Sequence, residues 1–145
     1  MKTANEYFES FLKSDDTIWI ISPKGNIFHS QRRGIAPLLI YIQRGPRADD
    51  VTILDKVTGN AAALLMKKAL CREVFSPLGS EPAVATLKHF GILTHFTHTV
   101  PHIINREGNG MCPFETMSLG QSPDEFYGLM RRNPLFADIF NGGRQ

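Results

Sequence analysis

The sequence VTILDKVTGNAAALLMKKALCREVFSPLGSEPAVATLKHFGILTHFT, residues 51–97, alternates short β-branched apolar runs with longer helical patterns. It predicts strands at 51–55, 72–76 and 92–97, and helices at 59–70 and 80–90. A β-α-β-α-β order implies parallel strands that are joined by right-handed crossovers. This stretch therefore predicts the centre of an α/β domain.

The flanking residues extend this pattern on both sides. We predict a helix at 3–13, a hairpin of strands 17–22 and 27–30, a helix at 35–43, and a further helix from Ser122 to about Arg132. Together these elements predict a three-layer α/β fold with a mixed sheet, in which a β-hairpin precedes the parallel βαβαβ units.

Length and composition favour one globular domain. The chain has 145 residues, of which 42% are hydrophobic and 21% charged, values that are typical of folded domains. We expect a single domain over 1–145, made of an N-terminal helix (1–14), a core (15–120) and a C-terminal helical appendage (121–145). The net charge of +2 is too small to indicate nucleic-acid binding.

The sequence predicts a cytoplasmic protein with no membrane contact. The opening residues MKTANEYFES contain no apolar segment of the kind found in a signal peptide. The longest apolar run, 61–66, is far shorter than the about 20 residues that span a bilayer. Two cysteines, Cys71 and Cys112, make no disulfide framework and fit a reducing compartment.

Three segments are predicted at the carboxyl ends of the parallel strands, where open α/β sheets bind their ligands. They are 55–60, 76–82 and 98–113, and they contain much of the chain's glycine and polar residues. The first two segments begin helices, whose free backbone N–H groups favour a phosphate or carboxylate. Either start is equally consistent with a helix cap and nothing more.

The candidate ligand-binding residues come from all three segments. Thr58 and Ser80 are candidate helix caps, and Asp55 and Glu81 are candidate acid/base groups. The predicted ligand contacts are Lys56, Thr58, Gly59, Asn60, Ser80, Asn105, Arg106, Gly108 and Gly110.

Cys112 is the one candidate nucleophile. It precedes Pro113, which is well placed as the first residue of a short helix, and Arg106 supplies a nearby cation. The alternative is a buried, inert cysteine, because no histidine is an obvious base for it. The spacing of His95, His98 and His102 puts no three imidazoles on one face, so we expect no metal and no cofactor.

Four short motifs carry a family resemblance over roughly residues 17–120. They are Arg33-Gly34-Ile35-x-Pro37-Leu38, Asp55-Lys56-x-x-Gly59-x-Ala61-Ala62-Ala63, Ser80-Glu81-Pro82-Ala83, and Pro101-x-Ile103-x-Asn105-Arg106-x-Gly108-x-Gly110-x-Cys112-Pro113-x-Glu115. With these motifs the chain resembles a small prokaryotic family of unknown function that is classed in the cytidine-deaminase-like superfamily.

The resemblance implies a sheet between helices, arranged as in the zinc deaminases. Those enzymes need His or Cys, with Glu two residues on, at one helix start and Pro-Cys-x-x-Cys at the next. Here the two starts read Gly59-Asn60-Ala61-Ala62 and Ser80-Glu81-Pro82-Ala83, with no thiol or imidazole. Zinc-dependent deamination is therefore disfavoured, and fold kinship carries no function across.

Three functions stay open from the sequence. The first is a binding module for an anionic small molecule or nucleotide. The second is a zinc-independent enzyme that uses Cys112 as nucleophile, Asp55 or Glu81 as acid/base, and Arg106 to orient an anion. The third is an interaction or homodimerising module, whose contact surface would be the aromatic side chains of Tyr7, Phe8, Phe11, Phe136 and Phe140.

Overall fold

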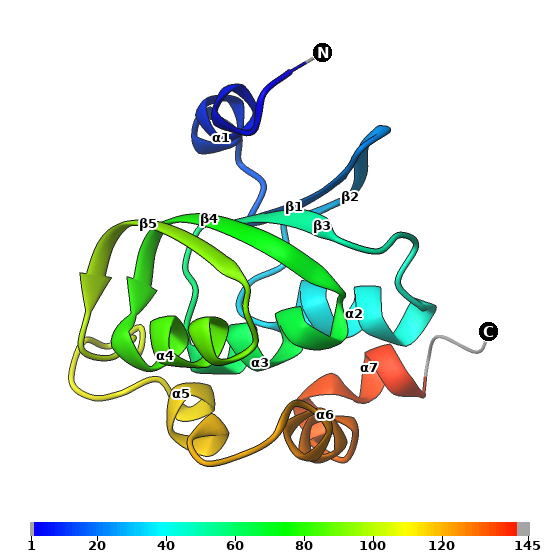
Figure 1. Cartoon of the computed structure of the whole chain (residues 1–145). Helices are drawn as coiled ribbons and strands as arrows, with labels where there is room; N and C mark the ends of the chain where they lie inside the picture. The colour runs from blue at the N-terminus through cyan, green and yellow to red at the C-terminus, as the bar shows by residue number, and fades with distance from the viewer. Residues whose placement is uncertain (1, 142–145) are drawn as a thin grey trace.

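A five-stranded mixed sheet forms the centre of the molecule in the computed structural model, which describes residues 2–141 (Figure 1). Its strand order is β2-β1-β3-β4-β5. The strands are β1 (Ile18–Ser22), β2 (Gly25–Ser30), β3 (Val51–Asp55), β4 (Cys71–Ser80) and β5 (Leu93–Val100). β1 runs antiparallel to β2 and β3, whereas β3, β4 and β5 are parallel, as the hairpin and the βαβαβ pattern predict.

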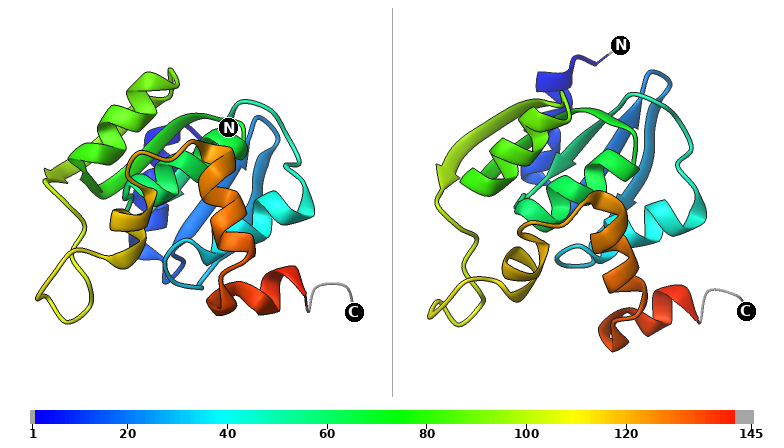
Figure 2. Two further views of the ribbon diagram at one scale, coloured as in Figure 1. Left: turned by 90° about the horizontal axis from the view of Figure 1, so that it is seen from below. Right: turned by 60° about the horizontal axis from the view of Figure 1, so that its bottom comes forward.

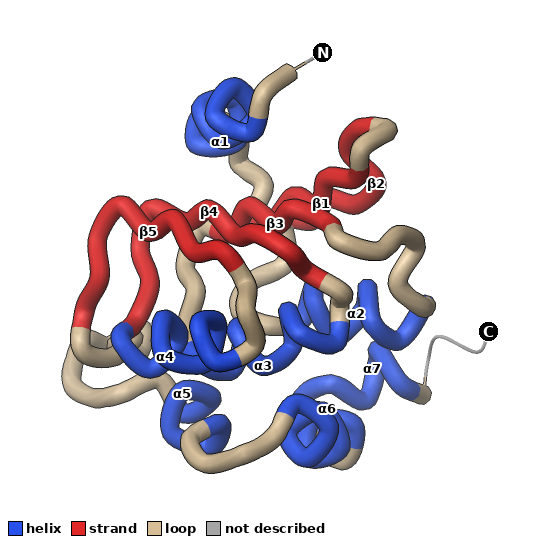
Figure 3. Tube along the Cα trace, viewed as in Figure 1, coloured by secondary structure: helices blue, strands red, loops and turns tan. Residues whose placement is uncertain are grey.

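Helices cover both faces of this sheet, as Figures 1 and 3 show. α1 (Ala4–Lys13) lies alone on one face, and α2 (Ala36–Arg44), α3 (Asn60–Lys68) and α4 (Glu81–His89) lie on the other. α5 (Pro113–Ser118), α6 (Pro123–Arg131), a 3-10 turn (Pro134–Phe136) and α7 (Ala137–Phe140) form a further layer beyond α3. Mixed α/β architecture is therefore confirmed.

Two hydrophobic clusters hold the layers together. The larger lies between the sheet and α2–α4, and the smaller lies beneath α1 around Phe11, Leu54 and Phe75. α6 crosses beneath α3 (Figure 2) and contributes the fully buried Phe126 and Met130 to the larger cluster. The C-terminal helices thus share the main core of the domain. Met1 and residues 142–145, the ends of the predicted segments 1–14 and 121–145, lie outside the described residues.

The strand β4 is longer than the sequence predicts. The predicted 72–76 extends to Ser80, although Pro77 and Gly79 are typical of a loop. Leu78 and Gly79 continue the ladder to β5, and the backbone N–H of Thr58 donates to the carbonyl of Leu78 at 2.9 Å. Gly79 is required there, because a Cβ would lie 2.1 Å from the ring of Phe96. The segment 76–82 is therefore mostly strand and helix start, not a loop.

The aromatic side chains of the interaction hypothesis pack within the domain. Phe11 and Phe136 are buried, and the ring centroids of Phe8 and Phe75 lie 5.6 Å apart. Phe140 contacts Tyr127 at 5.8 Å between centroids. These rings stabilise the fold of one chain, and a homodimer stays a prediction.

Candidate functional site

The carboxyl ends of β3, β4 and β5 lie together at one edge of the sheet. Residues after β3 join the end of β4 through a parallel bridge between Thr58 and Gly79. The backbone N–H of Ser80 also donates to the carbonyl of Thr58 at 3.1 Å. Two of the three segments predicted for the site are thus hydrogen-bonded neighbours.

Asp55 ends β3 as a buried acid. Its side chain is only 7% exposed, and burial raises the pKa of its carboxyl from the ordinary 3.8 to about 7. The hydroxyl of Thr58 donates to Asp55 Oδ2 at 3.2 Å, which opposes the rise of the pKa only in part. Thr58 is therefore not the predicted helix cap, because its hydroxyl serves Asp55.

Lys56, a predicted ligand contact, is engaged with the backbone of a neighbouring segment. Its ammonium donates to the carbonyls of Ser14 and Asp16, both at 2.8 Å, and lies 4.6 Å from the ring centroid of Phe11. Lysine is a strong donor to backbone carbonyls, and these are the free carbonyls that follow α1. The residue anchors the end of α1 to the sheet.

A carboxylate of the chain itself occupies the start of α3. Gly59 is the N-cap and offers no side chain, and Glu115 Oε1 accepts the backbone N–H of Asn60 at 2.5 Å. Glu115 Oε2 accepts the N–H of Ile103 at 2.8 Å, and the side chain is only 2% exposed. The predicted anion position at α3 is filled by Glu115, which comes from α5.

Gly59 and Asn60 both contribute to the contact between the start of α3 and α5. A Cβ at Gly59 would lie 3.1 Å from Glu115 Oε1, so the absent side chain makes room for the carboxylate. Asn60 Nδ2 donates to Ser118 Oγ at 2.9 Å, and its Oδ1 accepts the hydroxyl of Thr86. The Asn60 side chain therefore links α3 to α4 and α5 and is not available to a ligand.

Glu115 was missed as a site residue by the sequence reasoning, although it stands in the last family motif. It lies 55 positions from its partner Asn60, and no local spacing indicates such a contact. The only available signal was indirect. A helix start with glycine as its cap needs an acceptor from elsewhere in the fold.

The start of α4 is capped locally, as predicted. Ser80 Oγ accepts the backbone N–H of Ala83 at 3.2 Å, and Ser80 is completely buried. Glu81, the first residue of the helix, is exposed. A carboxylate there offsets the positive end of the helix, which weakens the prediction of an anion at α4.

Residues 104–111 form a tight turn that carries four of the predicted ligand contacts. Ile104 pairs with Met111, and the N–H of Asn105 donates to the carbonyl of Gly110 at 2.8 Å. Gly108 has a φ of +75°, a conformation that L side chains rarely adopt. Asn105 Nδ2 donates to Asn109 Oδ1 at 3.0 Å, and Asn105 Oδ1 accepts the backbone N–H of Asn109 at 3.2 Å, so the side-chain amide of Asn105 stabilises the turn itself. The turn extends from the edge of the molecule (Figure 2).

Arg106 and Cys112 differ in their surroundings. Arg106 is exposed at this turn and has no ion-pair partner in the described residues. Cys112 is half-buried and precedes α5 as its N-cap, while its backbone N–H donates to the carbonyl of Ile103 at 2.8 Å. Within residues 2–141, no hydrogen bond joins Cys112 to Asp55 or Glu81, so the proposed catalytic residues form no connected group.

An open cavity of about 500 Å³ lies at the carboxyl ends of the parallel strands, and we call it the strand-end cavity. Its lining is almost entirely apolar: Val57, Leu78, Val100, Pro101, His102, Ile103 and Ile104. The imidazole of His102 is the one polar side chain among them, and its Nδ1 is buried without a hydrogen-bond partner in the described chain. The predicted place of the site is thus hollow, but its wall is apolar.

The residue types that could hold a metal are not grouped in the part of the chain that the structure describes. No three His, Cys, Asp or Glu side chains of residues 2–141 are placed to share an ion. His95 instead bonds Glu73, with 2.7 Å between Nε2 and Oε2, and stacks on Phe75. Within the same residues, no helix is both long and apolar enough to cross a membrane.

Fold and site together define a small α/β domain with a cavity at the ends of its parallel strands. The family model of the domain of unknown function DUF1893 (TM1506) matches residues 8–132, so the chain belongs to the DUF1893 family. The crystal structure of a DUF1893 family protein (TM1506) from Thermotoga maritima is similar in fold. It has a TM-score of 0.79 and 24% sequence identity, over 90% of each chain.

No curated protein matches the chain. The family and the solved structure agree with the predicted family of unknown function and with the α/β fold. Membership of the cytidine-deaminase-like superfamily stays a prediction, because neither comparison addresses it.

Proposed function

We propose that the protein is a binding module for a small molecule whose apolar body lies in the strand-end cavity. The observation that carries the proposal is the apolar wall around His102, the one polar group, whose Nδ1 has no partner within residues 2–141. Ligand pockets typically enclose roughly 300–1,000 Å³, with mostly apolar walls and a few polar groups that orient the ligand. The strand-end cavity fits that description in both size and chemistry.

Of the two cations predicted as ligand contacts, Lys56 and Arg106, the second is the better partner for the expected anionic group. Lys56 is engaged with carbonyls, and Glu115 covers the start of α3, whereas Arg106 is exposed two positions beyond the cavity residue Ile104. A nucleotide would place its base in the cavity and its phosphate at Arg106. The apolar body is therefore the main determinant of binding, and the anion adds to it.

A pair of fluorescent probes tests the two parts separately. N-phenyl-1-naphthylamine is neutral, and 8-anilinonaphthalene-1-sulfonate is the same ring system with one sulfonate. Both probes are expected to bind, because each fills an apolar cavity. Arg106→Ala is expected to weaken only the sulfonate probe, by about tenfold, which corresponds to one charged contact. AMP is expected to displace that probe better than adenosine.

A matched pair of variants locates the binding. Val57→Asn with Ile104→Asn makes two exposed parts of the cavity wall polar and is expected to weaken the neutral probe about tenfold or more. Leu135→Asn is the control, since Leu135 is 70% exposed and lies outside the cavity wall. Equal loss in both variants, or no loss in the double variant, would contradict the proposal.

A further inference from the structure

The two edge strands of the sheet differ in what protects them. β2 and β5 end the strand order β2-β1-β3-β4-β5 and lie at opposite sides of the sheet (Figure 1). An edge strand presents backbone N–H and C=O groups with which another strand can pair, and proteins usually protect such an edge with bulges, prolines or charged side chains. The contrast between β2 and β5 therefore shows which edge is open to a partner.

β2 carries its own protection. In its pairing with β1, Phe28 and Asn26 face consecutive residues, so Ile27 is an extra residue that forms a bulge. Arg47 Nη1 donates to the carbonyl of Ile27 at 2.6 Å, and Asn26 Oδ1 accepts the backbone N–H of Phe28 at 3.1 Å. Side chains thus already bond to the backbone of this edge strand.

β5 has none of these features. Its sequence, LTHFTHTV, contains no proline, lysine, arginine, aspartate or glutamate. It keeps one register with β4, from Leu93 opposite Glu73 to Val100 opposite Ser80, so no bulge turns the edge away. Among residues 2–141, no hydrogen bond from outside β4 is made to its backbone. The exposed side chains of β5 are those of Leu93, His95, Thr97, His98 and Thr99.

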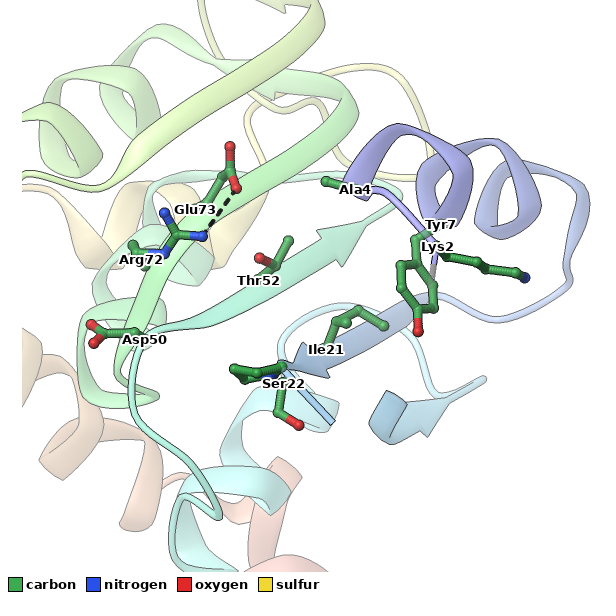
Figure 4. Close-up of a pocket in the computed structure, with 10 residues that line it drawn as sticks. Lys2, Ala4, Tyr7, Ile21, Ser22, Asp50, Thr52, Arg72 and Glu73 are labelled. Carbon is green, nitrogen blue, oxygen red and sulfur yellow. Dashed lines mark ion pairs between the residues drawn. The ribbon is translucent and has the colours of Figure 1, made fainter. Parts of the chain in front are cut away.

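The charges beside the open edge offset each other. Glu73 of β4 lies next to β5, and its carboxylate lies 3.7 Å from the guanidinium of Arg72, as Figure 4 shows. The same carboxylate contacts His95 Nε2 at 2.7 Å. Because β5 itself carries only threonine, histidine and apolar side chains, two identical copies of this edge can approach each other without repulsion between like charges.

We propose that the β5 edge pairs with β5 of a second copy of this chain, in antiparallel orientation. The pairing joins two five-stranded sheets into one continuous sheet about a two-fold axis perpendicular to it. Directly opposite residues of antiparallel strands point to the same face, so the axis must lie where a residue meets its own copy. In the centre of β5 that residue is Phe96 or Thr97.

Both registers give compatible cross-strand pairs. With the axis at Thr97, His95 lies opposite Thr99 of the second copy, and Phe96 lies opposite His98. With the axis at Phe96, the two phenylalanines meet and His95 lies opposite Thr97. Aromatic and β-branched side chains favour such pairs, and neither register brings like charges together. The strand is therefore complementary to itself, which favours a second copy over a foreign strand.

The proposed pairing brings part of the second copy to the strand-end cavity. β5 ends at Val100, which lines that cavity together with Pro101. In an antiparallel pair this end lies beside the start of the other β5, where the side chain of Leu93 is 53% exposed. With the axis at Thr97, Leu93 of the second copy lies opposite Pro101, at the rim of the cavity. The pairing itself rests on the free edge and does not depend on the proposed function.

The size of the assembly is the first test. Each copy has one open edge, so pairing closes at a dimer and does not continue into a filament. The contact is small, and we expect a dissociation constant of roughly 10–100 μM. Sedimentation velocity of the full chain up to about 1 mM should show a reversible monomer–dimer equilibrium. A monomer at every concentration, or an assembly larger than a dimer, would overturn the proposal.

A matched pair of variants locates the contact. Thr97→Lys places a charge on the exposed side of β5, where it faces its own copy or the residue beside it, and is expected to weaken the dimer at least about tenfold. His29→Lys places the same charge on β2, where the side chain is 71% exposed, and should leave the dimer unchanged. Equal effects of the two variants would contradict the assignment to β5.

Charge reversal tests whether the edge meets a second copy of itself. Thr97→Glu alone should be as monomeric as Thr97→Lys, for the same reason. An equimolar mixture of the two variants should form a heterodimer, because opposite charges then lie across the contact within reach of long side chains. Recovery of the dimer also shows that both variants are folded. A mixture that stays monomeric, or a dimer that survives in either variant alone, would overturn the proposal.

Discussion

The helices α3 and α4 begin side by side at the same edge of the sheet, but they satisfy their first N–H groups in different ways. α4 uses Ser80, the residue directly before it, whereas α3 begins after Gly59 and receives the carboxylate of Glu115. The first solution is local and the second joins distant parts of the chain. An apparently vacant helix start is therefore no proof of an external anion, since the fold can supply one itself.

The largest expected effect is that of removing the distant cap. Glu115→Ala leaves two N–H groups without an acceptor, the buried one of Asn60 and the half-buried one of Ile103. Two hydrogen bonds to a charged group are lost, so we expect the free energy of unfolding to fall by about 4 kcal/mol. Urea denaturation measures this loss.

Two further variants control that measurement. Glu115→Gln retains one carbonyl acceptor and is expected to lose about half as much. Glu107→Ala removes an exposed acid of the neighbouring turn and should be neutral. If Glu115→Ala were as stable as Glu107→Ala, the distant cap would contribute nothing to the fold.

The acid that precedes α3 predicts a pH dependence of stability. Asp55 has a folded-state pKa of about 7, against an ordinary 3.8, because of its burial. Between these two values the unfolded chain has lost the Asp55 proton and the folded chain has kept it. The Asp55 contribution to the free energy of unfolding therefore falls as the pH rises through this window, by about 4 kcal/mol, and it is constant above it.

Asp55→Asn removes this titration and nothing else that titrates. The unfolding free energy of the variant minus that of the wild type is expected to increase from about pH 4 to about pH 7, because only the wild type loses stability over this range. Urea denaturation at each pH measures both values. A difference that is constant over this range would show that the Asp55 carboxyl is ionised in the folded chain.

The local cap of α4 should matter less than the distant cap of α3. Ser80→Ala removes one neutral hydrogen bond to the N–H of Ala83 and is expected to cost about 1 kcal/mol in unfolding free energy. Thr3→Ala at α1 removes the same kind of bond and serves as a comparison. A loss at Ser80 larger than that at Glu115 would reverse the comparison of the two helices.

A third helix start, that of α5, is expected to show the smallest effect on stability. Cys112 makes no side-chain capping bond, so Cys112→Ser should change the unfolding free energy by less than about 0.5 kcal/mol.

The reactivity of the Cys112 thiol should still differ from that of Cys71, because burial raises the pKa of the Cys71 thiol to about 12. With iodoacetamide near neutral pH, the half-buried Cys112 should be alkylated first. Equal rates by intact mass would disprove this.

The comparison also explains what the sequence could predict. The caps at Thr3, Ser80 and Ser122 each join residues three positions apart. Ser80 was predicted as a cap, and helices were predicted to start at residues 3 and 122. The strand at 51–55 and the antiparallel pairing of the two hairpin strands follow from apolar patterns that are equally local. Such features need no knowledge of the tertiary structure.

The features that were missed depend on contacts between distant segments. β4 continues through Pro77 and Gly79 only because Thr58 and β5 pair with it. Lys56 has the residue type of an anion-binding group, and only the position of α1 shows that carbonyls hold it. The apolar wall of the strand-end cavity could not be predicted either, because it combines three strand ends with the chain after β5.

The most direct test of the proposed function is a titration of the labelled protein with N-phenyl-1-naphthylamine, followed by amide signals. If the strand-end cavity is the binding site, the signals of Val57, Leu78, Val100, His102 and Ile104 should shift together and saturate. If instead they remain fixed while signals of α1 or of residues 134–140 shift, the ligand site lies elsewhere and the account is wrong.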